Sequence, residues 1–211
     1  MRPLGFFVAD KNMEASLRGL FSRSEWHQSI GCTRVDVMPS DVRVASGYAD
    51  PGLYAHAAEL LRSESGIYER IVVMVDAEWE GSPGPLLIKE RIRDHIVKAG
   101  WHAESGLALV IDPEVDVWLW TRTDHTARAL GWPDWRTLKS ALEAKSLWLP
   151  TSKKPTRPKE AAEWALREKK QARSSIVYQR FASSVGLGRC TDPSFLELRA
   201  ALQKWFPVES N

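Results

Sequence analysis

The sequence predicts an α/β protein in which helices cover both faces of a parallel sheet and a helical region follows. Two short apolar runs, 71–75 (IVVMV) and 107–111 (LALVI), have the length and composition of strands buried on both faces. Stretches with helical spacing of apolar residues alternate with these strands. Alternation of this kind favours a parallel sheet, because each strand needs a crossover connection to run in the same direction as the last.

The N-terminal part contains the predicted strands. Residues 4–9 (LGFFVA) predict a first strand that ends at Asp10, and Asn12 is expected to cap the following helix. Alternation in 33–38 (TRVDVM) predicts a second strand, and Pro51 is typical of the first turn of the next helix. The remaining elements of this part are a strand, a helix and a strand, at 71–75, 86–97 and 107–111.

The C-terminal part is predicted to be helical. No further buried strand is indicated after Thr121, and the Pro-rich, basic stretch 150–158 (PTSKKPTRP) is typical of a linker. We therefore divide the chain into an α/β domain at 1–123 and a helical region at 124–211. The predicted helices of that region are 134–145, 158–170, 174–185 and 193–205.

Length and composition are those of a folded globular protein. The 211 residues fit one domain, alone or with a smaller appendage, and 44% are hydrophobic and 27% charged. The two cysteines form no CxxC pair, which excludes a thiol-rich zinc site and favours reduced thiols. No signal-peptide core and no run of about 18 apolar residues is present. We expect a cytoplasmic protein that does not enter the membrane.

Charge and tryptophan content restrict the function classes less sharply. The net charge of +2 argues neither for nor against nucleic acid, although basic residues gather from Lys153 onward and could form a phosphate-binding face. The ten tryptophans are scattered along the chain, so core packing is the favoured interpretation and a base-stacking platform the alternative.

Acidic residues follow three of the predicted strands. In open parallel sheets, ligand sites form outside the carboxyl ends of the strands. Asp76 and Glu78 are two residues apart, so an extended backbone would project them to the same side, where they repel unless a proton or cation lies between them. Carboxylate oxygens favour magnesium or manganese. The pattern predicts a metal site, with turn residues and helix caps as the alternative. The acids concerned are Asp10, Glu14, Asp76, Glu78, Asp112, Glu114 and Asp116.

Short segments after these strands resemble the motifs of the Toprim-like phosphotransfer domains. They are ADKNME, DAEWEG and PEVDVWLW, and the resemblance is closest to the branch related to RloB and OLD-type nucleases of bacterial defence loci. The segments RPKEAAEWAL, RSSIVYQRFASSVGL and RCTDPSFLELRAALQKWF resemble the C-terminal part of that branch. The resemblance spans nearly the whole chain and implies a Toprim-like sheet in a component of a methylation-associated phage-defence system.

The resemblance also implies roles for individual residues. Asp10 takes the position of the Toprim glutamate, as general acid or base, and Glu14 resembles a second acid there. Asp76 and Glu78 take the positions of the DxD motif and would hold Mg²⁺ or Mn²⁺, with Glu114 as a further ligand. The chain departs from the Toprim pattern at three positions. Asp10 stands where the motif has glutamate, Glu78 stands where the DxD motif has its second aspartate, and Lys11 stands where the motif has glycine.

The implied chemistry is metal-assisted cleavage of phosphodiesters. The expected partners are nucleic acid, with DNA favoured over RNA, and other proteins of the same defence operon. Lys154 and Lys159 would meet the phosphate backbone. The departures motivate an alternative, a non-catalytic component that binds nucleic acid or a partner protein. A metal-dependent enzyme for a small phosphorylated molecule is a third possibility.

Overall fold

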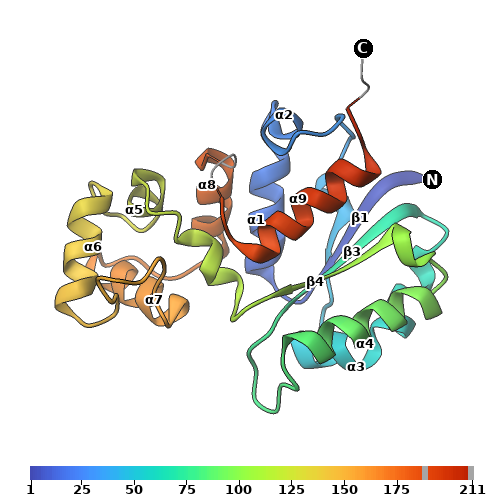
Figure 1. Cartoon of the computed structure of the whole chain (residues 1–211), viewed down its shortest axis with the longest axis horizontal. Helices are drawn as coiled ribbons and strands as arrows, with labels where there is room; N and C mark the ends of the chain where they lie inside the picture. The colour runs from blue at the N-terminus through green and yellow to red at the C-terminus, as the bar shows by residue number, and fades with distance from the viewer. Residues whose placement is uncertain (187–189, 209–211) are drawn as a thin grey trace.

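The computed structural model describes residues 1–186 and 190–208, and it confirms the α/β fold class (Figure 1). Four parallel strands form one sheet in the order β2-β1-β3-β4. All four strands therefore present their carboxyl ends at the same edge. The strands are β1 (Arg2–Val8), β2 (Val42–Val44), β3 (Tyr68–Asp76) and β4 (Gly106–Ile111).

Helices cover both faces of the sheet. The α-helices are α1 (Lys11–Phe21), α2 (Trp26–Ile30), α3 (Asp50–Leu61), α4 (Pro85–Lys98), α5 (Asp124–Ala129), α6 (Trp135–Ala144), α7 (Pro158–Glu168), α8 (Ser175–Ser184) and α9 (Pro193–Trp205). Helices α3 and α4 lie on one face, and α1 and α9 lie on the other (Figure 1). Helix α8 packs against α1, while α5, α6 and α7 lie to the side of the sheet. No helix in the described ranges is long and apolar enough to cross a membrane.

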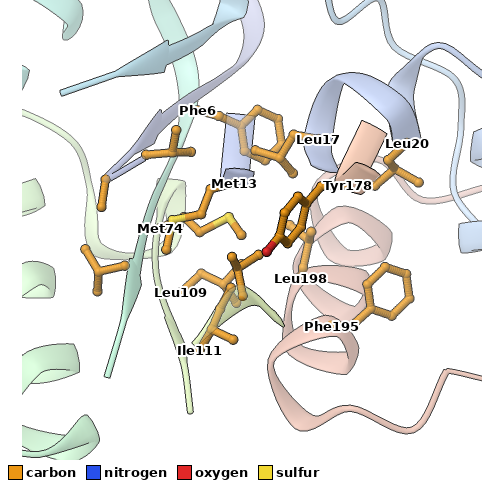
Figure 2. Close-up of a cluster of buried hydrophobic side chains, with 14 of the residues drawn as sticks. Phe6, Met13, Leu17, Leu20, Met74, Leu109, Ile111, Tyr178, Phe195 and Leu198 are labelled. Atoms are coloured by element: carbon orange, nitrogen blue, oxygen red, sulfur yellow. The ribbon is translucent and has the colours of Figure 1, made fainter. Parts of the chain in front are cut away.

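The core explains why the central strand reads as a continuous apolar run. Every residue from Ile71 to Val75 is at most 1% exposed, because helices cover both faces of β3. Figure 2 shows Phe6 of β1 and Met74 of β3 in one cluster with Met13 of α1, Tyr178 of α8 and Leu198 of α9. One hydrophobic cluster thus includes residues from both predicted domains.

Most predicted helices are confirmed to within a few residues, but the second predicted strand is wrong. Residues 33–38 form no strand, and β2 is the three-residue segment Val42–Val44. Val35 and Val37 are half-buried as the alternation suggested, yet they pack on the core from a loop. The backbone N–H of Thr33 donates to the carbonyl of Phe206 rather than to a strand.

The cap of the first helix also differs from the expectation. Asp10, not Asn12, caps α1, because its Oδ1 accepts hydrogen bonds from the backbone N–H groups of Asn12 and Met13 at 2.8 Å each. The short helices α2 and α5 were not predicted, since five or six residues carry too little periodicity to be recognised.

Helices α1 and α8 approach each other closely at Gly19. A Cβ atom at this position would lie 2.3 Å from the backbone oxygen of Gln179 and 3.0 Å from the Cβ of Ala182. We expect Gly19→Ala to lower the free energy of unfolding by up to about 2 kcal/mol, because the overpacking cost of about 1–3 kcal/mol is offset by only about 1 kcal/mol of helix propensity. Urea denaturation measures this. Gly66→Ala, where nothing lies within 4 Å, is the control and should be nearly neutral.

Candidate acidic site at the carboxyl edge of the sheet

Asp76 lies at the centre of the candidate site. It ends β3, and only 8% of its surface is exposed. Its Oδ1 accepts a hydrogen bond from the backbone N–H of Val115 at 2.8 Å, and its own backbone N–H donates to Oδ1 of Asp50 at 2.7 Å. Burial, followed by the negative charges of Asp50, Asp10 and Glu114, raises the pKa of Asp76 well above its ordinary value.

Each of the four strands leads to one carboxylate at this edge of the sheet. Asp76 is the carboxylate of β3, and the other three lie on the segments that follow β1, β2 and β4. Asp10 follows β1 and caps α1, and Asp50 is the first residue of α3, which β2 precedes. Glu114 follows β4 and precedes the 3₁₀ helix η4 (Val115–Leu119). The parallel topology therefore gathers Asp10, Asp50, Asp76 and Glu114, which we call the acidic cluster, at one edge of the sheet.

Asp50 is the member of the acidic cluster that sequence reasoning missed. With the second strand placed at 33–38, no strand end pointed to it. Burial raises its pKa, and the charge of Asp10 adds to this, whereas hydrogen bonds from backbone N–H groups and the charge of Lys159 oppose the rise. The signal available was its position directly before Pro51, the residue that was predicted to open a helix.

Glu78 does not continue the strand that ends at Asp76. The strand ends at Asp76, and the next two backbone N–H groups, of Ala77 and Glu78, both donate to the carbonyl of Pro113 at 3.0 Å. The prediction that Asp76 and Glu78 project to the same side is therefore wrong, because it requires an extended backbone and the strand ends before Glu78. Glu78 is exposed, whereas Asp76 is buried.

Glu78 and Glu114 line a cavity of about 490 Å³ together with Arg157 and Lys159. Nζ of Lys159 lies 3.7 Å from Oε2 of Glu114. Burial and the charge of Asp116 raise the pKa of Glu114, and Lys159 opposes the rise. The cavity therefore brings Glu78 and Glu114, which follow strands, together with charged residues of both signs at the start of α7, because Glu160 also lines it and pairs with Arg157 at 3.0 Å.

Two predicted site residues are engaged elsewhere. Glu14 forms an ion pair with Arg18, one turn along α1, at 2.6 Å. Lys154 forms an ion pair with the buried Asp192 and also donates to the carbonyl of Val117 at 3.1 Å. Burial alone would raise the pKa of Asp192, but hydrogen bonds from Lys154 and Ser194 bring that pKa below its ordinary value. Lys154 thus has a structural role, and Lys159 remains nearer the acidic cluster.

The donor chemistry of the acidic cluster fits a hard divalent cation. Carboxylate oxygens are the ligands that magnesium and manganese prefer, and a cation would relieve the repulsion that raises the pKa of Asp76. Within the described ranges, no three His, Cys, Asp or Glu side chains are grouped closely enough to hold one ion. Asp10, Asp50 and Asp76 each use Oδ1 to accept from a backbone N–H. Coordination by three of these residues therefore requires side-chain movement.

Comparison of the chain with protein-family models, with curated proteins and with solved structures gives no match.

Proposed function

We propose that the protein is a divalent-metal-dependent nuclease of the Toprim type that acts in anti-phage defence. The observation that supports this best is the convergence of Asp10, Asp50, Asp76 and Glu114 from four strand ends, with a raised pKa at Asp76. Three half-buried carboxylates around the buried Asp76 favour a proton or a cation, and a cation of the magnesium or manganese type suits the oxygen ligands. The defence setting is supported by the motif resemblance alone.

Each residue of the candidate site has a separate role in the proposed cleavage. Asp76 and Glu114 would hold Mg²⁺ or Mn²⁺, and Glu78 at the adjacent cavity would complete the ligands. The bound ion supplies polarisation of the phosphate and stabilisation of the leaving oxygen. Asp10 holds or moves a proton as general acid or base. Lys159 orients the phosphate backbone from the same cavity, whereas Arg157 is paired with Glu160 there.

A second candidate function is a non-catalytic component that binds nucleic acid or a partner protein. The observation in its favour is that the acids already serve as a helix cap and as acceptors for backbone N–H groups. In that case the acidic cluster stabilises the edge of the sheet, and no cation is required.

Incubation of the purified protein with single- and double-stranded DNA and RNA separates the two functions. The nuclease proposal predicts cleavage with Mn²⁺ or Mg²⁺ and none in EDTA. Binding without cleavage, equal in metal and in EDTA, would support the non-catalytic component instead. Cleavage that persists in EDTA would contradict the metal-dependent mechanism.

The two lysines assigned to nucleic acid should behave differently. We expect Lys159→Glu to weaken nucleic-acid binding about tenfold and to reduce the salt slope by about one, because a phosphate contact is lost. Lys154→Gln should change the salt slope little and should lower stability, since it leaves the buried Asp192 without its cationic partner. Salt-dependent filter binding and urea denaturation measure these effects. Equal salt slopes for the wild type and Lys159→Glu would remove Lys159 from the interface.

A further inference from the structure

A second cavity, of about 440 Å³, lies between the segment that follows η4 and the C-terminal region. No residue of the acidic cluster lines it. Its volume is within the range of sites for small ligands, about 300–1,000 Å³. Its lining includes Trp118, Arg122, His125, Lys153, Lys154 and Asp192.

The charge of this cavity is positive. Asp192 is the only acidic side chain among the described lining residues, and Lys154 already neutralises it. Arg122 and Lys153 form no ion pair in the part of the chain that the structure describes. Two cationic side chains without acidic partners favour an anion, and a guanidinium suits the oxygens of a phosphate.

Arg122 is held in an unusual backbone conformation. Its φ of 59° lies in the left-handed region, which side chains other than glycine rarely adopt. Hydroxyl groups hold the flanking backbone: Oγ1 of Thr121 lies 2.9 Å from that of Thr123 and 3.0 Å from that of Thr126. Oγ1 of Thr126 also donates to the carbonyl of Leu119 at 2.6 Å. Strain that the surroundings enforce in this way is frequent at ligand sites.

Trp118 supplies a fixed aromatic wall. Its Nε1 donates to Oγ of Ser194 at 2.8 Å, and its ring meets that of Phe195 edge-on, with centroids 5.8 Å apart and an angle of 90°. The indole is only half-buried, and it lines the cavity. An aromatic ring held in place at a basic cavity is a suitable stacking surface for a nucleobase.

We propose that this cavity binds a phosphorylated nucleoside. Arg122 and Lys153 contact the phosphate, and the base stacks on Trp118. A free mononucleotide and the 5′-phosphorylated end of a nucleic-acid strand share this chemistry. The inference does not depend on the proposed nuclease function, because the site contains no residue of the acidic cluster.

Calorimetric titration in EDTA tests the proposal without any contribution from divalent cations. Adenosine 5′-monophosphate should bind at least about tenfold more tightly than adenosine, because charge-assisted hydrogen bonds to phosphate are strong. A short 5′-phosphorylated oligonucleotide that binds more tightly than the mononucleotide would identify a strand end as the source. No binding of the monophosphate by the wild type, or equal affinity for adenosine, would overturn the proposal.

Two variants and a matched control locate the binding. Arg122→Gly removes the cation and suits the left-handed backbone, so affinity for the monophosphate should fall about tenfold or more while the Tm does not fall. Lys153→Gln should weaken binding in the same direction. The double variant Arg93→Gln/Lys98→Gln removes the same charges from the exposed surface of α4 and should bind as the wild type does. Unchanged affinity in both single variants, or an equal loss in the control, would overturn the proposal.

Discussion

Replacement of Asp76 by asparagine is expected to abolish metal-dependent cleavage. The amide oxygen can still accept the hydrogen bond from the backbone N–H of Val115, so the edge of the sheet should keep its structure. The negative charge nearest the centre of the acidic cluster is lost, and with it the cation that the cluster would hold. A catalytic cation contributes several kcal/mol to transition-state stabilisation, which corresponds to about 1,000-fold or more in rate.

The control for this variant lies in the loop that follows Asp76. Glu80→Gln removes one carboxylate from an exposed side chain that follows β3, and it should leave cleavage within about twofold of the wild type. Single-turnover cleavage with Mn²⁺ measures both variants. Retention of cleavage by Asp76→Asn would remove Asp76 from the catalytic site.

The same substitution should change the pH dependence of stability. The pKa of Asp76 is higher in the folded than in the unfolded protein, so between these two values the folded state binds more protons. The free energy of unfolding in EDTA therefore falls as the pH rises through that window toward neutral. Asp50 and Glu114 have raised pKa values and act in the same direction.

Urea denaturation in EDTA at pH 5 and pH 8 measures this effect. Asparagine does not titrate, so the loss of stability between the two pH values should be smaller in Asp76→Asn than in the wild type. Parallel pH profiles for the two proteins would show that Asp76 does not have a raised pKa in the folded state.

The second large effect is expected at Arg173. Asp116 in η4 is 1% exposed, and it accepts hydrogen bonds from Nη2 of Arg173 at 2.7 Å and from the hydroxyl of Tyr178 at 2.6 Å. Burial and the charge of Asp116 raise the pKa of Tyr178, so its hydroxyl stays protonated and donates. Arg173→Ala leaves a buried carboxylate without its cation, and we expect a loss of about 3–5 kcal/mol in the free energy of unfolding.

An exposed ion pair on α5 serves as the control for Arg173→Ala. The guanidinium of Arg128 lies 3.9 Å from Asp124 on the surface of α5, and Arg128→Ala should cost about 0.5 kcal/mol or less. Urea denaturation at neutral pH measures both. Similar losses of stability in the two variants would mean that the buried Asp116 does not need the charge of Arg173. The hydrogen bonds of Asp116 with Arg173 and Tyr178 would then not stabilise the packing of α8 against η4.

The parts of the fold that could be predicted are those with strong local patterns. The run Ile71–Val75 identified β3, because a strand covered on both faces must be apolar throughout. The alternation in 33–38 misled, because two half-buried valines in a loop give the same pattern as a short strand. β2 has only three residues, which is too short to produce a periodic signal.

Part of the acidic cluster could be predicted because three of its members follow strands with strong local patterns. Asp10, Asp76 and Glu114 follow strands that the sequence identifies. In a parallel sheet the carboxyl ends of these strands lie at one edge, so the three acids come together there. Asp50 was missed because its strand was misplaced. The pairing of Lys154 with Asp192 joins residues far apart in the chain, and no local pattern reports such a contact. Cations that look alike in sequence, such as Lys154 and Lys159, are thus distinguished only by the fold.

Calorimetric titration of Mn²⁺ into the wild type and into Asp76→Asn measures whether the acidic cluster is a divalent-cation site. We expect binding by the wild type and its loss in Asp76→Asn, with Glu80→Gln unchanged. Absence of binding in the wild type, or equal binding in Asp76→Asn, would mean that the acidic cluster holds no cation. The acids at the edge of the sheet would then be caps and hydrogen-bond acceptors that serve the fold alone.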